Sequence, residues 1–97
     1  MASGPIVGLL TVELQVTDAA TLKEKRQVVK SLVDRISDRF NVSIAEVGHL
    51  GNCRRALLAA AAVGNETAHV SRVTDAVLRF IESDPRAVVA EAEVEVL

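Results

Sequence analysis

The sequence predicts an α+β domain in which two helices cover one side of a four-stranded antiparallel sheet. Two observations predict this class. Apolar residues alternate with polar ones over residues 6–16 and 87–97, as in half-buried strands, and they recur at helical spacing over residues 22–40 and 65–84. A chain of 97 residues has the size of one domain, so residues 1–97 are taken as a single unit.

The first two elements are a strand over residues 6–16 and a helix over residues 22–40. The alternation in the strand predicts one face packed on a core. Thr21, with Glu24 three residues later, has the spacing of a capping box, which predicts that the helix begins at this point. The apolar side of the helix is expected to carry Leu22, Val29, Val33, Ile36 and Phe40.

Two strands are expected next, over residues 42–47 and 54–63, joined by a turn at residues 48–52. The second of them is rich in alanine on both sides, and alanine also favours a helix, so the face that it turns to the core is left open. A second helix is expected over residues 65–84, and a last strand over residues 87–97. The solvent side of that strand is expected to carry Glu91, Glu93 and Glu95.

The resulting order, β-α-β-β-α-β, matches the ferredoxin-like arrangement, with the first and third strands in the middle of the sheet. This topology gathers the start of the first helix and the turn at residues 48–52 at one end of the molecule. The end is expected to be basic although the whole chain has a formal charge of -2, and its cations are candidate contacts to nucleic-acid phosphates or another partner. The competing interpretation is a solvated surface with internal ion pairs. The candidate contact residues are Lys23, Lys25, Arg26, Lys30, His49, Arg54, Arg55 and Arg86.

Glu46 has the same strand parity as the inward-pointing Ile44, so it is expected to be partly buried and to need a cation. We expect a structural salt bridge from Glu46 to Arg55 across the hairpin, or to Arg26 on the helix.

Two helices on one side leave the other side of the sheet uncovered, and small apolar residues are expected there. An apolar uncovered face is typical of an interaction surface, so the sequence predicts a homo-oligomer that associates through it. The candidate interface residues are Val7, Leu9, Ala45, Val47, Leu58, Ala60 and Ala62.

Known catalytic patterns do not occur in the sequence. Cys53 is the only cysteine, which excludes a disulfide within the chain and a zinc site of several thiolates. His49 and His69 are expected at opposite ends of the fold, and there is no nucleophile elbow or glycine-rich phosphate loop. The predicted strands lack the aromatic residues with which an RNA recognition motif stacks bases. We therefore expect no enzyme, no metal and no cofactor.

The first residues of the chain show neither the basic region of a signal peptide nor an apolar stretch long enough for a membrane span. With one cysteine, this favours a cytoplasmic protein without a membrane partner.

Three short segments, L-K-E-K-R at 22–26, F-N-V-S-I-A-E-V-G-H at 40–49 and G-N-E at 64–66, give the chain a close resemblance to the bacterial YlxP-like family, the domain-of-unknown-function 503 family. The resemblance implies the ferredoxin-like fold and a bacterial source. It carries no established catalytic activity. Relatives often have an aromatic residue in the turn before the third strand, where this chain has Asn52 and Cys53.

Members of this family tend to be encoded near translation factors, which implies a ribosome-linked role. Together with the basic end, this predicts a non-enzymatic accessory factor that associates with the ribosome or RNA. The alternative function is a homo-oligomeric structural or regulatory module that associates through the uncovered sheet face.

Overall fold

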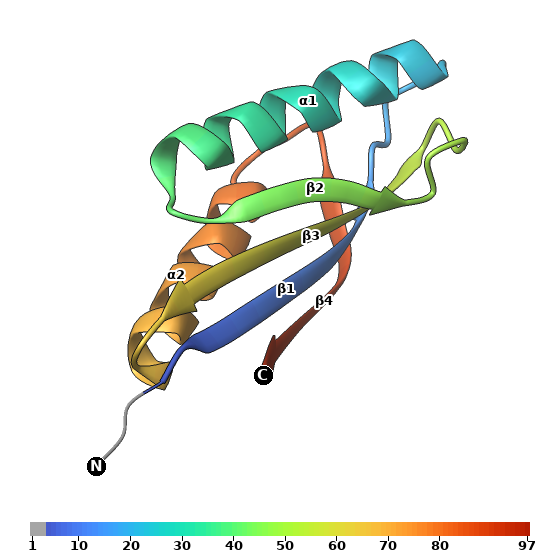
Figure 1. The fold of residues 1–97 in the computed structure, drawn as a ribbon. Helices are drawn as coiled ribbons and strands as arrows, with labels where there is room; N and C mark the ends of the chain where they lie inside the picture. Colours follow the sequence, from blue (N-terminus) through green and yellow to red (C-terminus); the bar gives the residue numbers. More distant parts are fainter. Residues whose placement is uncertain (1–3) are drawn as a thin grey trace.

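The computed structural model describes residues 4–97 and confirms the predicted order of strands and helices (Figure 1). The elements are β1 (Ile6–Gln15), α1 (Leu22–Arg39), β2 (Ser43–Gly48), β3 (Arg55–Gly64), α2 (Thr67–Glu82) and β4 (Val88–Val96). The observed fold is the expected α+β, ferredoxin-like one.

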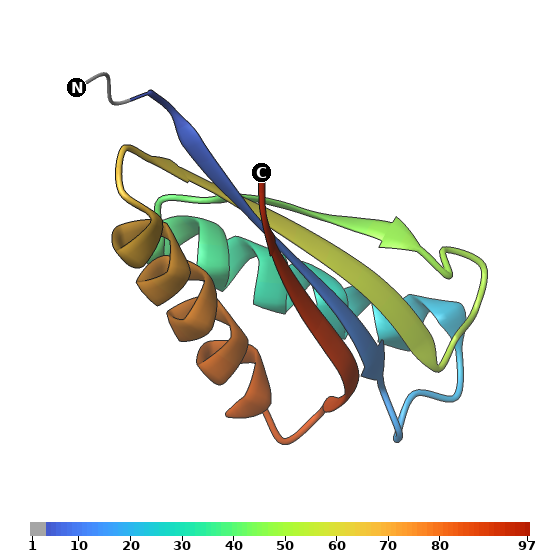
Figure 2. The ribbon, with the colours of Figure 1, turned by 90° about the horizontal axis from the view of Figure 1, so that it is seen from below.

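The strands form one antiparallel sheet in the order β2-β3-β1-β4, so the first and third strands are central, as predicted. Both helices lie on the same side: in Figure 2, α1 lies behind the strands and α2 to their left, and the opposite side of the sheet carries no helix of residues 4–97. We call that uncovered side the open face. The alanine-rich segment forms a strand because β3 finds backbone partners on both sides, in β1 and in β2.

The start of α1 is capped as the sequence predicts. The hydroxyl of Thr21 accepts a hydrogen bond from the backbone N–H of Glu24 at 3.1 Å. The Glu24 carboxylate in turn accepts one from the backbone N–H of Ala20 at 3.3 Å. The end of α1 is held by an aromatic contact, in which Phe40 and Phe80 meet edge to face with their ring centroids 5.8 Å apart.

The buried side of α1 is rotated from the predicted one. Leu22 and Val33 are only partly buried, and the centre of the buried side is occupied by Lys25, Val29, Leu32 and Ile36.

The core lies between the sheet and the two helices, and small residues bring these layers together. Leu10, Val12 and Leu14 of β1 are at most 1% exposed. A Cβ atom at Gly8 would stand 2.3 Å from Cγ1 of Val70, so the close approach of α2 to β1 requires glycine at this position.

The structure decides the parity of β3, which the sequence left open, and it contradicts three of the candidate interface residues. Leu58, Ala60 and Ala62 were expected on the open face, but each is at most 2% exposed and faces the helices. The open face of β3 is formed by the other set, namely Leu57, Ala59, Ala61 and Val63. The alternation has a period of two residues, so a shift of one residue moves a whole set of side chains to the other face.

Candidate functional site

The predicted contacts lie at one end of the molecule, which we call the turn end. It consists of the β1–α1 connection at residues 16–21, the first turn of α1, and the β2–β3 turn at residues 49–54. Direct bonds hold these parts together. The backbone N–H of Val16 donates to the carbonyl of Arg54 at 2.8 Å, and Nζ of Lys25 donates to the carbonyl of His49 at 3.1 Å.

Lys25 is inside the turn end and is not available to a partner, which corrects its predicted role. Its side chain is fully buried, and its Nζ donates to Oε2 of Glu46 at 2.6 Å. Glu46 is therefore in the predicted kind of salt bridge, but with Lys25 as its partner instead of Arg55 or Arg26. The bond joins α1 to β2, and the Glu46 side chain is 15% exposed.

Arg55 has a different partner because it lies on the open face, whereas Glu46 lies on the opposite face, which packs against the helices. Its Nη2 donates to Oε2 of Glu13 at 2.7 Å, and Nε2 of His49 contacts Oε1 of the same carboxylate at 2.7 Å. The hydrogen bonds from His49 and then Arg55 lower the pKa of Glu13 below its ordinary value. His49 has a φ of 57°, the only positive value at a non-glycine residue in the described part of the chain.

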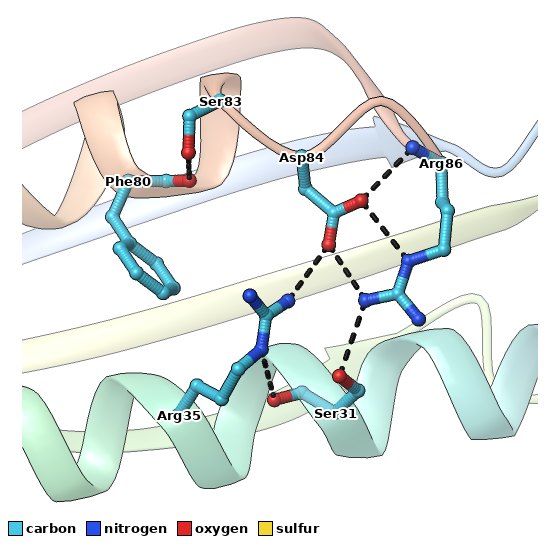
Figure 3. Close-up of polar contacts among 6 residues, drawn as sticks. All are labelled: Ser31, Arg35, Phe80, Ser83, Asp84 and Arg86. Carbon is cyan, nitrogen blue, oxygen red and sulfur yellow. Dashed lines mark hydrogen bonds and ion pairs between the residues drawn. The ribbon is translucent and has the colours of Figure 1, made fainter.

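Arg86, another predicted contact, is engaged with Asp84 at the start of β4 (Figure 3). Asp84 Oδ1 accepts from the backbone N–H and Nε of Arg86, and Oδ2 accepts from Nη2 of Arg86 at 2.7 Å and of Arg35 at 2.8 Å. The guanidinium of Arg86 also donates to the hydroxyl of Ser31 at 3.1 Å. These bonds to Arg86 and Arg35 hold the pKa of the buried Asp84 carboxyl well below its usual range.

The remaining predicted cations are exposed. Lys30 pairs with Asp34 one turn further along α1, at 2.6 Å, and both side chains are largely in solvent. Lys23, Arg26 and Arg54 have no carboxylate at ion-pair distance among residues 4–97. The positive charge that the turn end offers to a partner therefore comes mainly from these three residues.

A shallow hollow opens beside Arg54, where β1 ends and β3 begins. Its volume is about 470 Å³, and it is lined by Gln15, Thr17, Arg54 and Arg55. The two arginines are fixed at the backbone, because Oδ1 of Asn52 accepts from the N–H of Arg54 at 2.8 Å and of Arg55 at 3.0 Å. The hollow therefore presents guanidinium donors from the β2–β3 turn and the start of β3, and amide and hydroxyl donors from the end of β1 and the residues after it.

The open face is the second candidate surface. The predicted Val7, Leu9, Ala45 and Val47 do lie on it, and Val47 is 53% exposed. Glu91, Glu93 and Glu95 of β4 stand along one edge of this face, opposite Glu13, Thr11 and Leu9 of β1.

Sequence reasoning missed the burial of Lys25 and the role of Glu13. Lys25 was detectable, since positions 25, 29, 32 and 36 follow helical spacing with apolar residues at the other three. Glu13 resembled any polar residue on the solvent side of a strand, and only the fold brings His49 and Arg55 to it.

Arrangements for metal binding or nucleophilic catalysis are not found in residues 4–97. No group of three or more His, Cys, Asp and Glu side chains there is placed to hold a metal ion. His49 is hydrogen-bonded to the carboxylate of Glu13. Among residues 4–97, no Ser, Thr or Cys side chain, which could act as a nucleophile, is hydrogen-bonded to His49. None of the helices in that part of the chain is both long and apolar enough to cross a membrane.

Comparison with known proteins gives a family. The family described as "Protein of unknown function (DUF503)" matches residues 7–94, which is most of the chain. The chain belongs to the DUF503 family. This confirms the resemblance seen in the sequence motifs.

A curated relative of this DUF503 member is the "Uncharacterized protein YlxP" of Bacillus subtilis (strain 168). The two are 36% identical over 80 residues, which cover 82% of this chain and 87% of the relative. Among solved structures, the "De novo designed protein Foldit4" has a TM-score of 0.56 at 16% identity and covers 97% of both chains. That likeness shows the fold alone. The DUF503 match describes a family of unknown function, so a role has to be argued from the surfaces described above.

Proposed function

We propose that this DUF503 protein is a non-enzymatic accessory factor that contacts phosphates of RNA, in the ribosome or elsewhere in the cytoplasm, with its turn end. The observation that carries the proposal is the hollow lined by Gln15, Thr17, Arg54 and Arg55. Lys23 and Arg26, at the start of α1, have no carboxylate at ion-pair distance among residues 4–97.

The hollow suits a phosphate group. Arginine donates to phosphate through a planar fork of N–H groups, and the exposed Thr17 hydroxyl and Gln15 amide add neutral donors. Arg55 is anchored by one nitrogen to Glu13, which leaves its other N–H groups for a ligand. Arg54 has no carboxylate partner among the described residues, so a phosphate would not have to displace one.

The same arrangement favours contact with the RNA backbone over recognition of single bases. Base-specific RNA binding on such a sheet uses exposed aromatic side chains for stacking. Here the two phenylalanines, Phe40 and Phe80, pack against each other beside the helices. We therefore expect affinity that depends strongly on salt and weakly on sequence.

The test is the binding of a short single-stranded RNA and an RNA hairpin, measured by fluorescence anisotropy between about 50 mM and 200 mM salt. We expect Arg26→Glu with Arg54→Glu to weaken binding at least about tenfold. The slope of log affinity against log salt should become shallower by roughly 1.4 to 1.8, because each phosphate contact contributes about 0.7 to 0.9.

The matched control is Arg72→Glu with Arg79→Glu, which makes the same change of charge at exposed positions on α2. We expect this control to bind like the unchanged protein apart from a small uniform loss. An equal loss in both double variants would show that only net charge matters and would refute a site at the turn end.

A further inference from the structure

The open face has the composition of an interface on three of its four strands. β2, β3 and β1 present Ala45, Ala59, Ala61 and Leu9 at its centre, with Val63 at one end, 61% exposed. β4 differs, because opposite Leu9, Thr11 and Glu13 it presents carboxylates, and its one apolar residue on this side is Val88 at its start. The apolar patch is therefore centred on β3, and the acidic edge lies beyond β1.

The size of the patch is near what a weak dimer needs. β1 and β3 have ten residues each and are about 34 Å long, whereas β2 has six and is about 20 Å long, so at a spacing of about 4.8 Å the three strands cover roughly 420 Å² in projection. The accessible area of the side chains is larger. A standard interface takes about 800 Å² from each partner, and weak associations take less. We therefore expect a pair of copies that dissociates on dilution.

The charges decide how two copies can meet. If the two-fold axis ran across the strands, β4 of one copy would lie over β4 of the other, with Glu93 facing Glu93. Three carboxylates of one copy would then oppose three of the other, which is unfavourable. If the axis runs parallel to the strands and lies between the two sheets, directly over β3, then β1 of one copy faces β2 of the other. Both β4 edges then stay at the rim in solvent.

We propose that two copies of this chain pair through their open faces, about a two-fold axis parallel to the strands and centred on β3. In this arrangement Ala59 and Ala61 meet the same residues of the second copy, and their small side chains let the two sheets approach closely. The partner is a second copy because the patch is then self-complementary, with each carboxylate edge outside the contact.

Light scattering at protein concentrations up to about 500 μM, well above a micromolar Kd, gives the first test. We expect a mass near twice 10.3 kDa, or about 20.6 kDa, falling on dilution. A mass of one chain over the whole range would overturn the proposal, and a larger assembly would overturn the two-fold arrangement.

Ala59→Glu tests the face, because it places a charge at the dry centre of the contact. We expect the dimer Kd to rise at least tenfold. Ala68→Glu, at an exposed position on α2, is the control and should leave the Kd unchanged. Circular dichroism melts show whether each variant folds. A folded Ala59→Glu variant that stays dimeric would refute the open face as the interface.

Cross-linking tests the axis independently of that variant. With Cys53→Ser as background, each chain carries one introduced thiol, either Ala59→Cys or Glu93→Cys, so that any cross-link joins two copies. A short bismaleimide should join the Ala59→Cys chains and leave the Glu93→Cys chains single. Efficient cross-linking at Glu93→Cys would mean that the axis runs across the strands and would overturn the proposed arrangement.

Discussion

At the scale of single residues, the buried ion pair between Lys25 and Glu46 fixes the geometry of the turn end. A lysine without solvent contact has to have its charge met inside the protein, and here one carboxylate and one carbonyl meet it. The bonds tie α1 to both β2 and the turn that follows it. The exposed cations Lys23 and Arg26, on the same first turns of α1, are positioned by this contact.

Removing one partner of the pair should therefore cost more than a surface change. We expect Lys25→Ala to lower the free energy of unfolding by about 3 to 5 kcal/mol, because Glu46 is left without its cation and a cavity forms. Urea unfolding measures this difference. Lys25→Met with Glu46→Gln keeps the shape and removes both charges, so it should recover part of the loss. A double variant less stable than Lys25→Ala would contradict this explanation.

The parity of β3, which the sequence left open, decides two predictions about residues. The expected bond between Arg55 and Glu46 puts Arg55 on the side of the sheet that faces the helices, which sends Leu58 and Ala60 to the open face. In the structure Arg55 lies on the open face, and Leu58 and Ala60 face the helices. The sequence could not decide this, because both parities of β3 carry a leucine and alanines, and a register shift interrupts the β2–β3 pairing between Glu46 and Gly48.

At the scale of elements, the Asp84 cluster joins the end of α2, the start of β4 and the middle of α1 (Figure 3). Its carboxylate is 4% exposed and is bonded by two guanidinium groups that are about half exposed. The cluster holds the second helix against the first where the two have few other contacts. Its stability should depend on pH, because the pKa of Asp84 is low in the folded state.

The direction of this pH dependence follows from the difference between the folded-state and unfolded-state pKa of Asp84. A carboxyl with a lower pKa in the folded state stabilises the fold above its unfolded pKa of about 3.9 and loses that contribution as the pH falls below it. The unchanged protein should thus lose more stability between pH 6 and pH 2.5 than Asp84→Asn does, and Asp84→Asn should be about 1 to 3 kcal/mol less stable near pH 7.

Thermal melts across that range give the comparison, with Asp75→Asn on the exposed side of α2 as the control. The control should follow the unchanged protein at every pH. Parallel curves for Asp84→Asn and the unchanged protein would show that the cluster does not contribute to acid sensitivity.

The elements themselves could be predicted because their patterns are local. Alternation marks β1 and β4, and Thr21 with Glu24 marks the start of α1. The pairing of charges was not predictable in the same way. Glu13 and His49 are far apart in the sequence, and their contact depends on the strand order and on the left-handed backbone of His49.

At the scale of the whole molecule, the two proposed surfaces are compatible. The turn end and the open face use different residues, apart from the Glu13, Arg55 and His49 group at their border. A two-fold axis parallel to the strands would place both turn ends of a dimer on the same side. Two phosphate contacts could then act on one RNA, and the second contact would gain from the high effective concentration that the first creates.

Sedimentation of the tagged protein through a density gradient, in lysate from its source cells, tests the central claim most directly. We expect the protein in the ribosome-containing fractions at low salt, its release at high salt or after ribonuclease treatment, and no cosedimentation of the Arg26→Glu, Arg54→Glu variant. Unchanged protein that stays at the top of the gradient at low salt would contradict contact with the ribosome, and a double variant that sediments equally well would contradict a contact through the turn end.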